Sequence, residues 1–340
     1  DAMSHKATRR DFFRTAGVGL AAGWGAWLAA REAAADPVGR TDAKPGVKVG
    51  GPTGHAARIE GGRIIEPQQE IPLLQQADVL VVGGGPAGVC AAIAASRAGA
   101  KTALVERYGH LGGLWTGGLV LVVLGHWTTC KVQVCQGIGE EMMKRLDGIE
   151  GAVCNRKPGV NPTVDAEALK YVMVQMLQEA GVDVVLHCWG VDAVMDGTTI
   201  KGAIFESKSG RQAILAKAVV DATGDGDVFA AAGAEHERRL YNIGLPCRIG
   251  NLDKVDAAKA QGKKPRGLGS VTPVPGVNWV NMTGPDADGV DVKELTRLEL
   301  AHRQQIWKQV QAIRATPGYE KVYLMETAPQ LGVRITRVLA

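Results

Sequence analysis

Runs of apolar residues, separated by glycine turns, organise the chain from about residue 77 onwards. Residues 78–82 are mostly β-branched, and such a run predicts a strand that is buried on both faces. A glycine-rich turn follows, and an alanine-rich stretch then predicts a helix from Val89 to about Ala98. A second strand is predicted at 101–106. Strands that alternate with helices in this way predict an α/β fold built on a parallel sheet with helices on both faces.

The same patterns continue further along the chain. Apolar residues at helical spacing between Leu169 and Ala180 predict one helix, and residues 292–314 predict another, with Leu295, Leu298, His302, Ile306 and Ile313 on its buried side. We expect strands at 182–189 and 218–221, and a hairpin formed by 200–205 and 213–215. Residues 251–290 are rich in loop-forming residues.

The first 35 residues have the organisation of an export signal. A basic stretch with Lys6, Arg9 and Arg10 precedes a weakly apolar run over 16–30, and small residues then precede Asp36. The adjacent arginines followed by two phenylalanines resemble the twin-arginine motif of bacteria, which implies the twin-arginine export machinery as a partner and a periplasmic or secreted location. The apolar run is shorter than the ~20 residues that span a bilayer. An uncleaved membrane anchor is the alternative.

Composition excludes several classes of protein. The 340 residues carry a net charge of +4, of which only +2 belongs to residues 36–340, so the basic surplus typical of nucleic-acid-binding proteins is absent. Glycine accounts for 45 residues, about twice the usual ~7%. Such a glycine content suits a fold with many tight turns and close approaches of the backbone to a ligand.

A dinucleotide fingerprint follows the first buried strand. Gly83, Gly85 and Gly88 form the pattern Gly-x-Gly-x-x-Gly, with Pro86 and Ala87 inside it, and Glu106 ends the second strand. The glycines allow a tight turn, a close approach to a pyrophosphate and close packing of helix on strand, while the helix N-terminus stabilises the phosphates. Glu106 is placed to accept hydrogen bonds from ribose hydroxyls.

Two further segments distinguish FAD from NAD. After Glu106 come Arg107, the glycine pair Gly112-Gly113 and Thr116, and a second glycine pair at this place resembles flavoproteins of the glutathione-reductase-like FAD fold. The run Ala222-Thr223-Gly224-Asp225, which follows an apolar strand, resembles a motif of the same fold. No second Gly-x-Gly-x-x-Gly follows a strand, so the sequence indicates no separate NAD(P)H domain.

Together these segments resemble the FAD-dependent oxidoreductase family, often found as secreted bacterial flavoproteins. The likeness covers residues 64–340 and includes 327–337, which is similar to the family's Gly-x-Arg-x-Thr-Arg segment. It implies FAD as cofactor, backbone contact of Val191 with the adenine, and Thr223–Asp225 lying along the cofactor. Ile335 stands where the family usually has an acidic residue, and the chain ends at Ala340, before the stretch that closes over the isoalloxazine ring in such proteins.

These observations predict a division of the chain. We expect an export signal over 1–35, a linker over 36–76 with one short strand near 63–65, and a Rossmann-like FAD-binding domain over 77–130 and 181–235. An α+β substrate or cap region is expected over 131–180 and 236–340. We expect this region to be incomplete at its C-terminus.

The catalytic residues are not evident, because a flavin performs hydride transfer itself and the protein binds, orients and tunes it. Arg334 and Arg337 are candidates to bind a substrate carboxylate or the negative charge that develops on the flavin, and ordinary ion pairing is the alternative for both. His126, and also His110, are weaker candidates for a base or a covalent flavin attachment.

The six cysteines and the metal-ligand residues point to little further chemistry. Cys130 and Cys135 have the Cys-x4-Cys spacing of flavin disulfide reductases, but they lie well after the glycine pair, and scattered structural cysteines are the alternative. No metal-binding motif is present. The sequence therefore predicts an exported FAD-dependent oxidoreductase whose flavin accepts hydride from a small molecule such as a sugar. An NAD-dependent dehydrogenase and a flavin-binding electron-relay module without its own substrate are the alternatives.

Overall fold

A computed structural model of the chain describes residues 56–281 and 283–340. The predicted export signal and residues 36–55 of the predicted linker lie outside the described residues. The chain divides into two units, 1–69 and 70–340. In the described part of the first unit, strands β1 (Arg58–Glu60) and β2 (Arg63–Ile65) form an antiparallel hairpin, which confirms the strand predicted near 63–65.

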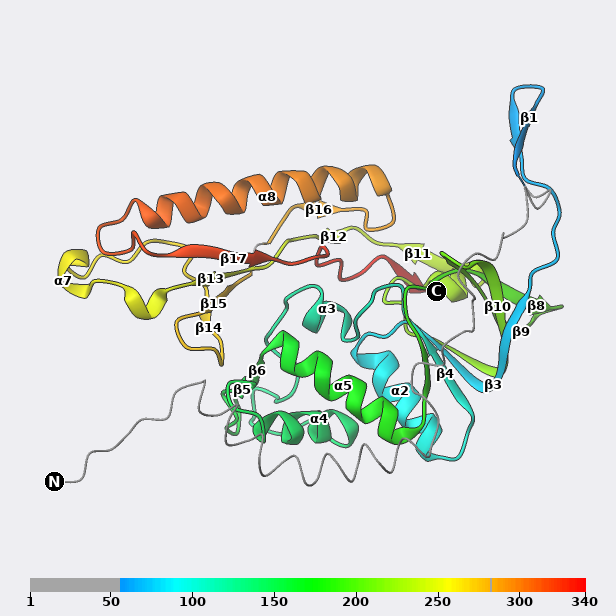
Figure 1. The fold of residues 1–340 in the computed structure, drawn as a ribbon, viewed down its shortest axis with the longest axis horizontal. Helices are drawn as coiled ribbons and strands as arrows, with labels where there is room; N and C mark the ends of the chain where they lie inside the picture. Colours follow the sequence, from blue (N-terminus) through cyan, green and yellow to red (C-terminus); the bar gives the residue numbers. More distant parts are fainter. Residues whose placement is uncertain (1–55, 282) are drawn as a thin grey trace, which may run out of the picture. The chain divides into compact units, whose positions relative to one another are not determined.

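A six-stranded sheet organises the second unit (Figure 1). In sheet order its strands are β7 (Asp183–Val185), β4 (Thr102–Val105), β3 (Leu73–Val82), β10 (Gly210–Asp221), β9 (Thr199–Ser207) and β8 (Trp189–Asp196). The first four are parallel to one another, whereas β9 pairs antiparallel with both β10 and β8. The α/β class is confirmed, and the sheet is mixed rather than wholly parallel.

Two details of the predicted strands are corrected. The segments predicted as 213–215 and 218–221 form a single strand, β10, because its first half pairs with β9 while most of its length pairs with β3. The segment predicted as one strand over 182–189 is divided into β7 and the start of β8. His187 adopts a positive φ of 59° between them, which an extended strand does not allow.

The two faces of the sheet are covered differently. The helices α2 (Pro86–Arg97), α4 (Ile138–Asp147) and α5 (Ala166–Ala180) share one buried cluster with Val81 and Leu104, so the longer helices of this half lie on one face (Figure 1). On the other face, side chains of β3 and β4 pack with Phe205, Ile214 and Val228, which belong to β9, β10 and the short helix α6 (Asp227–Ala231). The expectation of helices on both faces is met there only by α6.

A smaller antiparallel sheet lies further along the chain. Its order is β14 (Ser270–Val271), β15 (Asn278–Val280), β13 (Cys247–Gly250) and β17 (Tyr323–Thr327). Helix α8 (Val292–Arg314) has the predicted bounds, and Leu298, His302, Ile306, Val310 and Ile313 are its buried residues. Most of these residues share one cluster with β13, β15, Leu119 and Leu121, so this sheet and α8 pack against the segment that follows the second glycine pair.

Short elements complete the described fold. They are α3 (Gly113–Thr116), α7 (Ala257–Ala260), the 3-10 helix η1 (Leu252–Lys254), and the strand pairs β5 (Val153–Cys154) with β6 (Thr163–Val164), β11 (His236–Arg238) with β18 (Arg337–Leu339), and β12 (Tyr241–Asn242) with β16 (Asp286–Ala287).

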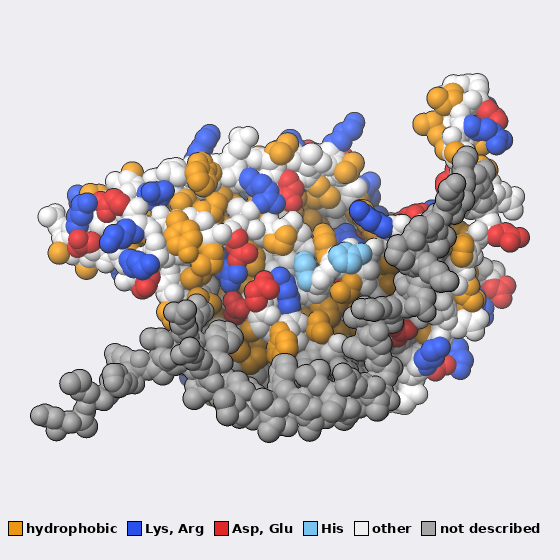
Figure 2. Space-filling model, in the orientation of Figure 1, with side chains coloured by type: hydrophobic (Ala, Val, Ile, Leu, Met, Phe, Trp, Pro, Cys, Tyr) orange, Lys and Arg blue, Asp and Glu red, His pale blue; other side chains and the backbone are white. Residues whose placement is uncertain are grey.

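The surface carries charges of both signs. Figure 2 shows basic and acidic side chains interspersed over the described part of the face that it draws, with no single-sign patch. All six cysteines lie in the described part of the chain and are free thiols. Among the described helices, none has the length and apolar character needed to cross a bilayer.

Candidate cofactor-binding site

The glycine fingerprint forms the turn between β3 and α2, and its glycines are required by sterics. Gly83 has a φ of +107°, and a Cβ there would lie 2.3 Å from the carbonyl oxygen of Ala222. A Cβ on Gly88 would lie 1.8 Å from the carbonyl oxygen of Gly83. Helix α2 starts at Pro86, next to Ala87, and Gly85 at its N-cap offers no side chain to its first N–H groups. Those N–H groups are therefore free to bind an anion.

The second glycine pair lies directly against the first motif. The N–H of Gly112 donates a hydrogen bond to the carbonyl of Gly84 at 2.8 Å, and a Cβ on Gly113 would lie 3.1 Å from the Cα of Gly85. Thr116 lies behind this contact, where it is 1% exposed and its hydroxyl donates to the carbonyl of Leu111. In this arrangement Thr116 fixes the glycine turn, and its predicted contact with the cofactor stays a prediction.

Glu106 is buried beside the fingerprint. Its Oε2 accepts a hydrogen bond from the N–H of Gly84 at 2.6 Å, and its Oε1 accepts one from the N–H of Tyr108 at 2.8 Å. The side chain is therefore held at the carboxyl end of β4, with lone pairs left to accept further hydrogen bonds. This is the position that the sequence predicts for contact with a ribose.

A small pocket opens at the carboxyl ends of β3 and β4. Its lining residues are Val82, Gly83, Val105, Glu106, Arg107, Cys188, Trp189, Gly190, Thr223 and Asp227. Gly83, Glu106, Arg107 and Thr223 were candidates from the sequence, and the structure brings them together. Val191 is on β8, 40% exposed and outside this lining. Its predicted contact with the adenine stays a prediction.

Arg107 occupies one wall of the pocket between two aromatic rings. Its guanidinium carbon lies 4.9 Å from the ring centre of Tyr108 and 5.7 Å from that of Trp189. One guanidinium nitrogen is 4.0 Å from a carboxylate oxygen of Asp225. The side chain is thereby positioned by cation–π and electrostatic contacts while it stays partly exposed to the pocket.

The turn after β10 is organised by Asp221. One carboxylate oxygen accepts hydrogen bonds from the N–H and hydroxyl of Thr223, and the other accepts from the N–H groups of Val228 and Phe229 at the start of α6. Ala222 donates its N–H to the carbonyl of Val82, and Gly224 adopts a φ of +81°. Residues 222–225 are thus held beside Gly83, as expected for a segment that lies along a dinucleotide.

Asp225 connects this turn to the segment 336–337. The hydroxyl of Thr336 donates to Asp225 Oδ1 at 3.2 Å, and Arg337 Nη1 donates to the carbonyl of Asp225 and to Asp227 Oδ1, each at 2.8 Å. Burial raises the pKa of the Asp225 carboxyl, and the nearby Arg107 opposes that shift. Arg337 therefore forms an ion pair, which was the alternative left open by the sequence.

Arg334 differs from Arg337 in its surroundings. It is exposed, and its guanidinium carbon lies 5.2 Å above the ring of Tyr241. Among the residues that the structure describes, no carboxylate lies within ion-pair distance of Arg334. It remains available to bind an anion.

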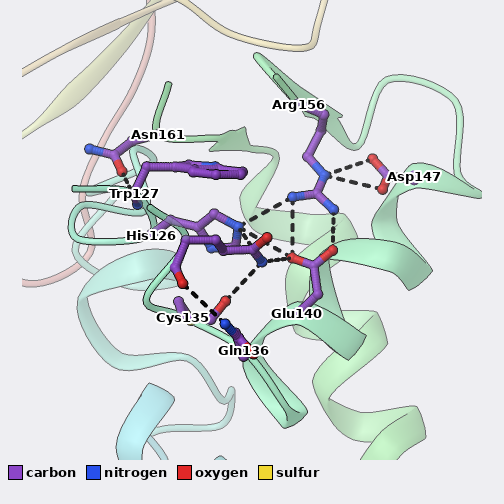
Figure 3. Close-up of polar contacts among 9 residues, drawn as sticks. His126, Trp127, Cys135, Gln136, Glu140, Asp147, Arg156 and Asn161 are labelled. Atoms are coloured by element: carbon purple, nitrogen blue, oxygen red, sulfur yellow. Dashed lines mark hydrogen bonds and ion pairs between the residues drawn. The ribbon is translucent and has the colours of Figure 1, made fainter. Parts of the chain in front are cut away.

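His126 is fully buried in a polar network on the loop before α4 (Figure 3). Its Nε2 lies 3.2 Å from Glu140 Oε2, and Arg156 pairs with the same carboxylate at 2.7 Å. Gln133 donates its amide hydrogens to Cys135 O and Glu140 Oε2, and its nitrogen and Arg156 Nη1 lie 3.3 Å and 3.4 Å from His126 Nε2. Burial lowers the pKa of His126. His126 has no exposed surface, and none of its hydrogen bonds or ion pairs within the described residues involves the glycine motifs. Its candidacy as a base or as a flavin attachment stays a prediction.

The residues of the pocket and the two glycine motifs fit FAD. A Cβ on Gly83 or Gly88 would fill the turn, the N-terminal N–H groups of α2 lack side-chain partners, and Glu106 is fixed with acceptor capacity to spare. No group of His, Cys, Asp and Glu side chains suited to a metal ion occurs in the described ranges.

Several lining residues were not among the sequence candidates. Trp189 and Gly190 begin β8, Cys188 comes directly before it, and Asp227 begins α6. The antiparallel pairing of β8 with β9 places Trp189 at the pocket. The Asp196-Gly197 pair at the turn between the two strands is a local hairpin signal that could have indicated this pairing. Asp227 had a signal, because acidic residues commonly occur in the first turn of a helix.

Comparison with known proteins agrees with this geometry. Residues 78–239 match the family described as FAD dependent oxidoreductase. A digeranylgeranylglycerophospholipid reductase from Picrophilus torridus is 27% identical over 256 residues, which are 72% of this chain and 63% of the reductase.

Solved structures show the same fold. The myxobacterial chondrochloren halogenase CndH, described as a variant of FAD-dependent halogenases, has a TM-score of 0.50 and 15% identity over 76% of this chain and 63% of its own. For the p-nitrophenol 4-monooxygenase PnpA from Pseudomonas putida DLL-E4 the TM-score is 0.50, with 14% identity over 78% of this chain and 69% of its own. The chain spans less than two thirds of the length of the curated relatives it matches.

Proposed function

We propose that the protein is an exported flavoenzyme whose FAD accepts hydride from a small-molecule substrate such as a sugar, because residues 78–239 match the family described as FAD dependent oxidoreductase. When bound, the flavin supplies the hydride chemistry. The residues of the chain bind the cofactor, orient it and recognise the substrate.

One observation carries the cofactor role most directly. Two glycine motifs, separated by the 23 residues 89–111, meet backbone to backbone beside the buried carboxylate of Glu106. The N–H groups at the start of α2 are suited to a pyrophosphate, and Glu106 is suited to the ribose hydroxyls. Arg107 and Trp189 would flank the adenosine in the adjoining pocket.

Arg334 is the residue that we propose for substrate binding. Its guanidinium is exposed and held against Tyr241, whereas the charge of Arg337 is already balanced by Asp227. A stacked guanidinium keeps its in-plane N–H donors free, and these bind a planar carboxylate well. A sugar acid would combine a sugar that donates hydride to the flavin with a carboxylate that Arg334 binds.

The proposal also assigns segments of the chain to two functional regions. Residues 77–130 and 181–235 would form the FAD-binding domain, and 131–180 and 236–340 the substrate region. The basic stretch and apolar run in residues 1–35 support export through the twin-arginine machinery to the periplasm or the exterior. This pathway suits a protein that binds its cofactor before export.

Anaerobic reduction of the bound flavin tests the activity. The protein loaded with FAD is mixed with a panel of sugars, sugar acids and other small hydroxy compounds, and bleaching of the flavin absorbance is followed. A donor that reduces the flavin in wild type, and does so more slowly in Arg334→Gln, supports the proposal. Flavin that only a protein electron donor reduces would favour an electron-relay module instead. Stabilisation by NAD without any by FAD would favour an NAD-dependent dehydrogenase.

A further inference from the structure

The side chains of His110 and Gln330 meet at Gly117, directly after α3. A Cβ on Gly117 would lie 2.5 Å from His110 Cε1 and 3.1 Å from the amide carbon of Gln330. The N–H of Gln330 also donates to the carbonyl of Gly117 at 3.3 Å. Residues separated by 220 positions in sequence are therefore held side by side, and only glycine at position 117 leaves room for them.

Both side chains carry a buried polar atom without a partner. Within the described residues, neither His110 Nδ1 nor Gln330 Oε1 has a hydrogen-bond partner, although Gln330 is only 9% exposed. An unpaired buried polar atom costs about 1–3 kcal/mol, and native structures keep few of them without a reason. Two such atoms around one glycine indicate that a partner from outside the chain completes this arrangement.

The position of the pair along the cofactor site identifies that partner. Gly113, which begins α3, lies against Gly85 of the fingerprint, and α3 has four residues, so Gly117 follows about 6 Å further along the helix. The pocket with Glu106 and Trp189, which we assign to the adenosine, adjoins Gly83 at the start of the fingerprint. A dinucleotide whose pyrophosphate lies at Gly85 has its other half free to extend along α3 toward Gly117.

The electrostatic surroundings keep His110 neutral. Burial lowers the pKa of its imidazole, and the positive charge of Lys170 on α5 acts in the same direction, while the backbone of Leu111 and the carboxylates of Glu106 and Glu167 oppose the shift. The ring of His110 also stacks on Tyr108, with ring centres 5.4 Å apart. A neutral imidazole and a carboxamide together offer hydrogen-bond donors and acceptors without a net charge.

We propose that His110 and Gln330 hold the polar edge of the isoalloxazine ring, the end of FAD opposite to the adenine. That edge presents an N–H group between two carbonyls, and an amide oxygen with an imidazole nitrogen complements it. The inference rests on the proposed function, because it places a contact on the cofactor of that same site.

The test compares FAD with ADP, which shares the adenosine and pyrophosphate but lacks the flavin ring. Dissociation constants for both are measured by titration calorimetry on the full chain and on the variants Gln330→Met and His110→Phe, which keep size while removing polar atoms. The control is Gln75→Met, which changes another glutamine with an unpartnered buried nitrogen, on β3. The absorption spectrum of bound FAD is recorded for each variant.

The expected result is weaker FAD binding by about 2- to 10-fold in Gln330→Met and His110→Phe, with ADP binding unchanged and a shifted flavin spectrum. Gln75→Met is expected to match wild type. Equal losses for FAD and ADP would mean that the pair only supports the fold, and would overturn the inference. Unchanged FAD binding would also overturn it while leaving the proposed function intact. Wild-type protein that binds ADP but not FAD would overturn the proposed function itself.

Discussion

The N–H of Gly112 donates a hydrogen bond to the carbonyl of Gly84 at 2.8 Å, which joins the two glycine motifs of the chain. The dinucleotide fingerprint and the segment that leads to Gly117 are therefore one structural unit. A ligand that binds at the fingerprint is consequently in contact with residues that come from β3, α2, the loop after β4 and α3.

Replacement of Gly88 by alanine is expected to damage both the turn and cofactor binding. The new Cβ would lie 1.8 Å from the carbonyl oxygen of Gly83, so helix α2 must shift away from β3. Overpacking of this kind costs about 1–3 kcal/mol, and we expect that loss in unfolding free energy together with weaker FAD binding. Gly148→Ala is the matched control, because Gly148 has a φ of −81° and its Cβ would lie 3.4 Å from the nearest atom. Equal behaviour of the two variants in urea unfolding and FAD titration would contradict the account.

The two arginines of the segment 334–337 are expected to respond differently to mutation. Arg337→Gln leaves the carboxylate of Asp227 without its partner and removes a donor to the carbonyl of Asp225, so we expect a loss of about 1–3 kcal/mol in unfolding free energy. Arg334→Gln is expected to change stability by less than about 0.5 kcal/mol, because the residue is exposed. Urea unfolding of the two variants measures this difference in unfolding free energy. Comparable losses in both variants would show that Arg334 is a structural residue too.

A buried ion pair holds the smaller sheet against α5. Arg248 on β13 is 8% exposed, donates to Asp165 at 3.0 Å and also pairs with Glu326 on β17, while Asp165 caps the start of α5. Removal of one partner leaves buried charge unpaired, so Arg248→Met is expected to destabilise the protein by about 3–5 kcal/mol. Arg297→Met is the control, because its ion pair with Glu294 is exposed on α8. A thermal melt in which Arg248→Met matches the control would refute this role.

Acidification is expected to weaken the region around His126. Burial lowers the pKa of this imidazole from its ordinary 6.5, and the charge of Arg156 adds to that shift while Glu140 opposes it. The unfolded chain takes up a proton as the pH falls through about 6.5, whereas the folded chain resists it, so stability is lost from there down to the folded pKa.

The variant His126→Gln isolates this contribution, since it keeps a donor for Glu140 but does not titrate. Urea unfolding at about pH 7.5 and about pH 5.5 is expected to show a smaller loss for the variant than for wild type. Identical pH dependence of the two proteins would exclude His126 as the source.

Much of the fold was predictable where the signal is local. The buried run of β3, the glycine turn and α2 follow one another in sequence, and α8 has the bounds that its apolar spacing predicts. The hairpin of β9 with β10 was also predicted, because the two strands follow one another in sequence. The parallel pairing of β10 with β3 was not predictable, because it joins segments more than 100 residues apart. Helix α4 was not among the predicted elements, although its sequence carries local signals. It has glycines at both ends, acidic residues in its first turn and basic residues in its last.

The residues of the candidate site were likewise predictable only where the signal is local in sequence. The glycines and Glu106 could be predicted because the fingerprint fixes their spacing, and the structure brings them together with Arg107 and Thr223. The ion pair of Arg337 with Asp227 and the meeting of His110 with Gln330 could not, since each joins residues more than 100 positions apart through the packing of separate elements. The burial of His126 likewise follows from tertiary packing rather than from its neighbours in sequence.

The most direct test of the account is the visible absorption spectrum of the purified protein, recorded after incubation with FAD and removal of unbound ligand, and again after denaturation. The account predicts a flavin spectrum close to one FAD per chain, with all of the flavin released on denaturation because the proposed contacts to FAD are noncovalent. A protein that retains no flavin after this treatment would contradict the central claim that the two joined glycine motifs and Glu106 form an FAD site.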